Sequence, residues 1–139
     1  MSAFVEIKTA DLVGTALDWA TFCAVYPDMQ PIIKITESTT KLLFKNAAKP
    51  VTFPRSVRLA RMGLYGIEID WYPSGDWECG GPLIDKYAIE FEWITDLTIR
   101  AEVPACGTPG HARTHLIAAC RAIVASVLGD TVSVPKELV

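Results

Sequence analysis

The chain of 139 residues has the length of one domain, and half of its residues are apolar, which is enough for a core and excludes disorder for most of the chain. No apolar run approaches the roughly 20 residues of a membrane span, and residues 1–6 lack the basic and then apolar pattern of a signal peptide. The net charge of −3 argues against a nucleic-acid-binding protein. We therefore expect a single domain over residues 1–139, in the cytoplasm, without a membrane partner.

The charges are unevenly distributed along the sequence. Between positions 41 and 61 every charged side chain is basic, and these residues are Lys41, Lys45, Lys49, Arg55, Arg58 and Arg61. Between Glu68 and Glu102 nine acidic residues accompany only Lys86 and Arg100. Two solvated segments that differ in charge explain this asymmetry, and so does a surface that steers a charged partner.

The first expected elements are a short strand over residues 4–7 and a helix that reaches about Val25. Thr9 is a favourable N-cap for this helix, and the apolar residues between positions 12 and 23 recur at steps of three and four. Pro27 ends the helix because proline cannot continue the hydrogen-bond ladder.

The middle of the chain gives weaker signals. Short strands are expected over residues 32–35 and 42–45, with a turn at 37–40 between them. Residues 55–62 fit either a short helix or an irregular strand, and both alternatives stay open. The alternation over residues 67–71 indicates a half-buried strand.

Proline and glycine mark a turn over residues 72–77, which we call the aromatic turn. Pro82 then suits the first position of a short helix that continues to about Lys86. Thr114 is the expected N-cap of a second long helix, from His115 to Leu128, before a C-terminal glycine. This helix is apolar almost all round, so we expect it at the centre of the fold.

Alternating side chains over residues 89–103 predict a β-hairpin. A three-residue loop at 94–96 would pair Trp93 with Leu97 and keep the apolar residues on one face. It would also set Glu90 opposite Arg100. Long helices separated by several strands predict the α+β class, with a mainly antiparallel sheet and two main helices packed on one face.

Residues with binding chemistry gather at two places. The aromatic turn and its flank carry Trp71, Tyr72, Asp76 and Trp77, which could stack and hydrogen-bond a planar ligand or a partner side chain. The same tryptophans could instead anchor the loop on the core while Asp76 caps a backbone amide. The second place carries Arg55, Arg58 and Arg61, which could hold a phosphate or an acidic surface, or could simply be solvated.

The sequence contains no strong catalytic motif, so an enzyme ranks third among the functions considered, and no cofactor is expected. His111 and His115 are four residues apart, with Cys106 nearby. Since Thr114 is the expected N-cap, His111 would lie in a loop and His115 at an exposed first helical position. We therefore expect no metal site. The four cysteines lack metal-ligand spacing and are expected as free, mostly buried thiols.

Three stretches together resemble a phage family, the NinX-like proteins, a domain of unknown function. Residues 76–84 resemble its D-W-x-x-G-G-P-[LI]-I segment, and residues 12–20 resemble its L-x-G-x-A-L-D-W-A helix. Residues 116–121 and 128–135 resemble its L-I-A-A-M-R helix and its L-G-D-x-V-x-V-P tail. Residues 27–66 carry no motif of that family. The resemblance implies a phage or prophage origin and the host cytoplasm, and it supplies no catalytic residues.

Two functions from different classes follow as hypotheses. The first is an accessory protein that binds a host or phage protein through the basic segment or the aromatic turn. The second is a small-ligand protein, for a nucleotide-like ligand, that uses Trp71, Trp77 and the arginines. A homodimer is compatible with exposed sheet edges, although no self-complementary seam indicates one.

Overall fold

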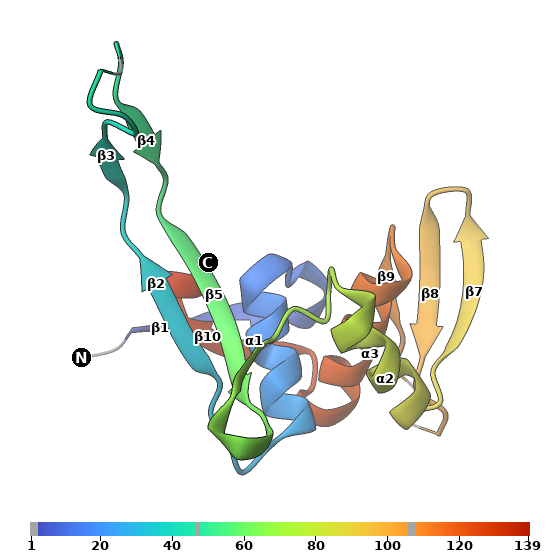
Figure 1. Cartoon of the computed structure of the whole chain (residues 1–139). Helices are drawn as coiled ribbons and strands as arrows, with labels where there is room; N and C mark the ends of the chain where they lie inside the picture. The colour runs from blue at the N-terminus through green and yellow to red at the C-terminus, as the bar shows by residue number, and fades with distance from the viewer. Residues whose placement is uncertain (1–2, 47, 106–107) are drawn as a thin grey trace.

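The structure is a computed structural model that describes residues 3–46, 48–105 and 108–139. In these residues three α-helices and ten strands form an α+β fold in which every strand pair is antiparallel (Figure 1), so the predicted class is confirmed. The helices are α1 (Gly14–Val25), α2 (Trp77–Lys86) and α3 (His115–Leu128). The strands are β1 (Phe4–Lys8), β2 (Ile32–Thr36), β3 (Thr39–Lys41), β4 (Val51–Phe53), β5 (Ser56–Met62), β6 (Glu68–Asp70), β7 (Glu90–Thr95), β8 (Thr98–Glu102), β9 (Gly110–Ala112) and β10 (Thr131–Pro135).

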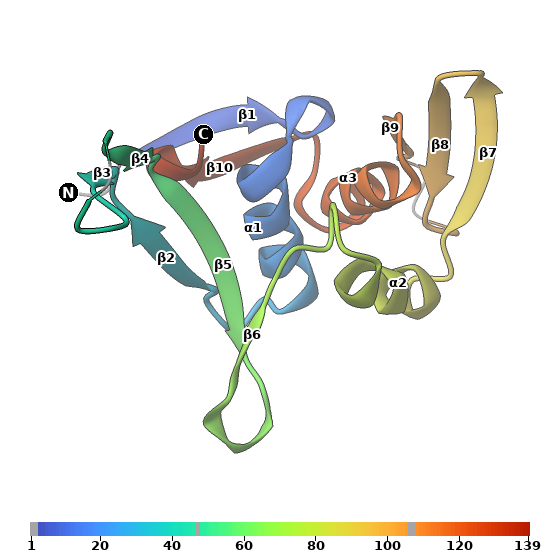
Figure 2. The ribbon, with the colours of Figure 1, turned by 45° about the horizontal axis from the view of Figure 1, so that its top comes forward.

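The strands of the described residues divide into four small sheets. Their strand orders are β1-β10, β2-β5-β6, β3-β4 and β7-β8-β9. Helices α1 and α3 lie in the middle, with β1, β10, β2 and β5 around α1 and with β7 and β8 beyond α3 (Figures 1 and 2). The fold therefore has a helical centre with strands on both sides.

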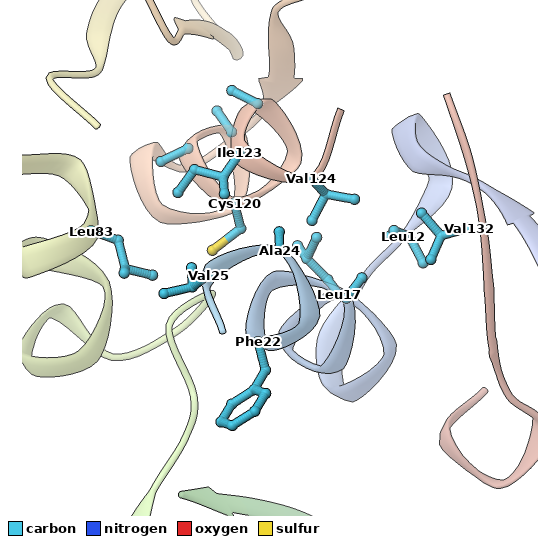
Figure 3. Packing of buried hydrophobic residues seen from close by; sticks show 14 of the residues in the cluster. Leu12, Leu17, Phe22, Ala24, Val25, Leu83, Cys120, Ile123, Val124 and Val132 are labelled. Carbon is cyan, nitrogen blue, oxygen red and sulfur yellow. The ribbon is translucent and has the colours of Figure 1, made fainter. Parts of the chain in front are cut away.

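Helix α3 has the bounds that its sequence predicts. The Thr114 hydroxyl accepts from the Ile117 N–H at 3.2 Å, and Gly129 follows the last turn with a φ of 97°. Cys120 of α3 points toward Ala24 and Val25 of α1, and Val124 lies on the side of Leu17 (Figure 3). The expected central helix is confirmed. Its capping residues and its apolar positions specify the same helix.

Helix α1 begins four residues later than predicted, at Gly14, and Val13 at its N-cap makes no side-chain capping bond. Thr9 lies instead in a 3₁₀ turn, where its hydroxyl donates to the Gly129 carbonyl at 2.6 Å. Its N–H donates to the Asp130 carbonyl at 2.7 Å. The prediction was wrong because these long-range bonds, which local spacing does not show, use the polar groups that a cap would use.

The strands predicted for the middle of the chain are confirmed in part. Strand β2 forms where it is expected, and residues 55–62 take the strand alternative as β5. No strand forms over residues 42–45; strand β3 instead overlaps the end of the predicted turn and pairs with β4. Strand β6 is exposed along its length, so the expected half-buried strand is wrong there, and the burial belongs to Trp71.

Helix α2 begins at Trp77 rather than at Pro82. The Asp76 carboxylate accepts from the Glu78 N–H at 3.0 Å and so caps the helix five residues earlier than predicted. The carbonyl that Pro82 leaves without a helical donor belongs to exposed Glu78, where water can pair with it. Gly80 permits close packing, since a Cβ at this position would lie 2.5 Å from the Pro73 carbonyl oxygen.

The β7–β8 hairpin keeps the predicted faces but has a different register. Trp93 pairs with Ile99, and a register shift follows before Thr95 pairs with Thr98. The turn is therefore two residues long, and the Thr95 hydroxyl accepts from the Leu97 N–H at 3.1 Å. The extra residue, Ile94, acts as a bulge and keeps the apolar side chains of the two strands on one face. Arg100 consequently lies opposite Glu92 rather than Glu90, and its side chain bonds Glu102 on its own strand at 2.8 Å.

Candidate functional site

Trp71 ties the aromatic turn to helix α1. Its indole N–H donates to the Asp18 carbonyl at 2.8 Å. Phe22 and Tyr26 meet its ring edge-on, with centroids at 5.5 and 5.8 Å. Only 4% of Trp71 is exposed, so the residue offers little surface to a stacked ligand. In this geometry Trp71 is an anchor that fixes the position of the turn.

Asp18 lies directly beneath the turn. Its Oδ1 accepts from the Ser74 N–H at 2.9 Å, and only 2% of the residue is exposed. Burial raises the pKa of the Asp18 carboxyl to about 6, and the hydrogen bonds from Ser74 oppose that rise. Sequence reasoning missed this residue. The available signal was an acidic residue between Leu17 and Trp19, inside an apolar helix.

A pocket of about 400 Å³ opens beside Asp18. Helix α1, strand β5 and the aromatic turn form its walls, which bring together residues far apart in the sequence. Its charged lining residues are Asp18, Arg58, Asp70 and Asp76. The only cation among them, Arg58, has its Nη1 3.9 Å from Asp70 Oδ1, and both of these side chains are largely exposed. The pocket therefore carries more negative than positive charge.

The four candidate residues at the aromatic turn do not form one platform. Tyr72 and Asp76 line the pocket with Trp71, and the Tyr72 ring lies where a Cβ at Gly75 would be. Trp77 is 59% exposed and lines a different pocket of about 350 Å³. The structure thus separates Trp77 from the other three residues.

Trp77 belongs to an aromatic cluster around His115. The imidazole meets the Phe91 and Trp93 rings edge-on, with centroids at 4.9 and 5.8 Å, and the Trp77 ring is 6.3 Å away. His115 is therefore half-buried rather than exposed as expected. His111 lies on β9 rather than in a loop.

Metal-ligating residues do not gather in the part of the chain that the structure describes, since no group of three His, Cys, Asp or Glu residues is placed to hold a metal ion. The expectation for Cys106 falls outside the described residues. Cys23, Cys79 and Cys120 are free thiols. Burial raises the pKa of all three, that of Cys120 to about 12, which disfavours the reactive thiolate.

The three candidate arginines do not converge on one site. Arg55 lies 3.7 Å from Glu37 across the hairpin, while Arg58 lies beside Asp70 at the pocket. Arg61 is half-buried, and the alternation along β5 places it on the opposite face from Arg58.

Residues 37–46 and 48–55 form a projection that we call the arm. Strands β3 and β4 extend the β2–β5 hairpin away from the helices (Figures 1 and 2). Its basic residues are Lys41, Lys45, Lys49 and Arg55, against the single acid Glu37. Every described residue of the arm is exposed, including Leu42, Leu43 and Phe44 near its tip. Sequence reasoning found the basic charge of this segment but not its projection.

The fold and the sites define an α+β protein with a mainly acidic pocket and a basic arm. The model of the family described as Bacteriophage P22, NinX matches residues 8–127, and the chain belongs to this family. A comparison with curated proteins found no match. Among the described residues, no helix is long and apolar enough to cross a membrane.

The segments that carry the family resemblance meet in space. Residues 12–20 lie in and before α1, residues 76–84 lie in and before α2, and residues 116–121 lie in α3. Arg121 joins two of them, because its Nε donates to the Leu12 carbonyl at 3.0 Å. The matched range also includes the arm, for which the sequence offered no family motif.

Proposed function

We propose that this phage protein is an accessory protein of the bacterial cytoplasm that binds a host or phage protein through its arm. The observation that carries the proposal is the exposed apolar tip of the arm. Phe44 is 71% exposed, and Leu42 and Leu43 are each more than half exposed. Contiguous exposed apolar side chains on a folded protein mark an interaction surface.

The arm has no apparent role in holding the helices together. None of its described residues belongs to the hydrophobic core cluster. A two-stranded ladder such as β3–β4 is at best marginally stable alone in water. An element that is exposed on both sides and contributes nothing to the core is best explained by a partner that covers it.

The charges of the arm indicate the chemistry of that partner. Lys41 and Lys45 flank the apolar tip, so a complementary surface has an apolar groove with an acidic rim. The acidic strand β7 lies at the other end of the molecule from the arm (Figure 1). This separation of charge would orient the arm toward an acidic partner before contact.

Site-specific photo-crosslinking during infection tests the proposal. A photo-reactive amino acid replaces Phe44 at the tip of the arm, and in a matched control it replaces Leu97, an exposed residue at the turn of the β7–β8 hairpin. We expect a discrete adduct with one other protein from position 44 only. Adding Lys41→Glu and Lys45→Glu should remove the adduct without changing the thermal midpoint.

Two outcomes would contradict the proposal. The first is the same set of adducts from positions 44 and 97, which would indicate random collisions. The second is an adduct formed only between two copies of this chain, which would make the arm a homodimer interface. An adduct that survives the double charge reversal would refute the acidic rim.

Small-ligand binding is a second candidate function, and the pocket beside Asp18 favours it. Its volume of about 400 Å³ lies within the range of small-molecule sites. A nucleotide-like ligand that stacks between Trp71 and Trp77 is less favoured, because Trp71 is buried and Trp77 lines another pocket. A ligand that binds only the folded protein must raise its thermal midpoint, which gives a direct measurement.

A further inference from the structure

The pocket beside Asp18 combines a buried acid with two more carboxylates. Asp18 comes from α1, Asp70 is the last residue of β6, and Asp76 lies in the aromatic turn. Arg58 offsets Asp70 at 3.9 Å and makes no ion pair with Asp18 or Asp76. The lining thus keeps two carboxylates without a basic partner among the described residues.

Asp18 is the unusual member of this set. An ionised carboxylate in an apolar environment is costly unless it is hydrogen-bonded and paired with a cation. Its hydrogen bonds come from Ser74, whose N–H donates to Oδ1 at 2.9 Å and whose side chain also contributes, and both partners are uncharged. Within the described residues no Lys, Arg or His lies within ion-pair distance of it. The fold therefore holds the carboxylate in place but supplies no positive charge that pairs with it.

We propose that this pocket binds a small organic cation, whose ammonium or guanidinium group lies against the Asp18 carboxylate. The inference rests on the second candidate function, ligand binding at the pocket, and is independent of the arm. It names the chemical class of the ligand, which the pocket volume alone does not.

The other walls suit such a ligand. Val57 and Leu59 of β5 give an apolar surface for an alkyl chain, and the Tyr72 ring is available for a cation–π contact. Asp76 already accepts from the Glu78 N–H, so it adds negative charge from a fixed position. The same charges repel phosphate, which disfavours a nucleotide in this pocket.

Trp71 provides a local reporter for binding. Its indole N–H donates to the Asp18 carbonyl, at the floor of the pocket. In an ¹⁵N-labelled sample, agmatine and putrescine should shift the Trp71 indole N–H signal and leave that of Trp93 unchanged. AMP serves as the anionic probe. A blocked Gly-Arg-Gly peptide shows whether the cation is a free molecule or an arginine side chain of a polypeptide.

Three variants test the assignment. Asp18→Asn keeps an acceptor for the Ser74 N–H and should weaken agmatine binding about tenfold, the effect of losing a hydrogen bond to a charged group. Asp76→Asn keeps a good N-cap and should weaken binding about threefold, as expected for a partly exposed charge. Glu90→Gln on β7 removes the same charge away from the pocket and should change nothing.

The outcomes test separately whether the pocket binds a ligand and whether that ligand is an organic cation. Saturable shifts with either cation, weakened by Asp18→Asn, support it. Shifts with AMP but not with the cations would overturn the proposal that the ligand is an organic cation. They would still support ligand binding at this pocket. No shift with any probe at millimolar concentration would overturn both. Equal binding by wild type and both pocket variants would show that the cation binds elsewhere.

Discussion

Replacing Asp18 with Asn should make the protein more stable at neutral pH and should have little effect in acid. The pKa of the Asp18 carboxyl is raised by burial to about 6, whereas an unfolded aspartate titrates near 3.9. Between about pH 4 and 6 the folded protein therefore binds more protons than the unfolded chain. Its free energy of unfolding falls as the pH rises through this window, and the full penalty is present above it.

The magnitude follows from the size of the shift. A difference of about two pKa units corresponds to about 3 kcal/mol, and Asp18 is buried enough for this figure to need little correction for solvent. Asparagine carries no charge and can still accept from the Ser74 N–H. The stability of Asp18→Asn relative to wild type should therefore rise by about 3 kcal/mol between pH 4 and pH 7.5.

Urea unfolding of both proteins at several pH values measures this difference. Ile123→Val is a matched control, since it removes one buried methyl group from the core and should cost about 1 kcal/mol at every pH. A relative stability of Asp18→Asn that does not depend on pH would refute the reasoning. A relative stability that falls as the pH rises would mean that the folded protein favours the ionised carboxylate.

Three further predictions concern the packing of α3 and its surroundings. Gly110→Ala should destabilise the protein by several kcal/mol in urea, because its Cβ would collide with the Ala118 backbone of α3; an unchanged midpoint would refute the contact. Thr9→Val should cost about 1–3 kcal/mol, because the Gly129 carbonyl loses its donor, and Thr9→Ser should recover most of that loss. The Cys120 thiol, with its pKa raised to about 12, should react with a thiol reagent only after unfolding, as absorbance would show; rapid modification of the folded protein would contradict its burial.

Local signals were enough to predict helix α3. The Thr114 cap, the apolar positions and Gly129 are all near neighbours in the sequence, and each specifies the same helix. Strands β1 and β2 were also predicted, each to within one residue at its end. In these elements the local preferences and the tertiary packing agree.

The errors arose where a contact distant in sequence decided the structure, or where one local signal overrode another. Thr9 resembles a cap, but its hydroxyl bonds Gly129 from across the fold. Pro82 resembles a helix start, but Asp76 caps α2 earlier and exposed Glu78 tolerates the missing bond. The alternation in the β7–β8 hairpin fixed its faces, whereas the bulge before Thr95 fixed its register.

The candidate sites were predictable only in part. Trp71, Tyr72 and Asp76 are close in sequence and remain close at the pocket, but Trp77 turns toward His115 because α2 begins there. Asp18 could not be placed beneath the turn from its own segment, since its partner Ser74 is 56 positions away. The sequence shows the basic charge of the arm. Its projection could not be predicted, because it depends on which strands pair.

The pairing of β1 with β10 has a consequence for synthesis on the ribosome. Thr9 and Gly129 are 120 positions apart, so β1 must wait for its partner strand after it has itself emerged. At a translation rate of roughly 5–20 residues per second, that delay is about 6–24 seconds. During it the hydrogen-bonding edge of β1 and its apolar residues Phe4 and Val5 are open to other chains. This sheet closes only once residues 131–135 have been made, so newly made chains are most exposed to misassociation before that point.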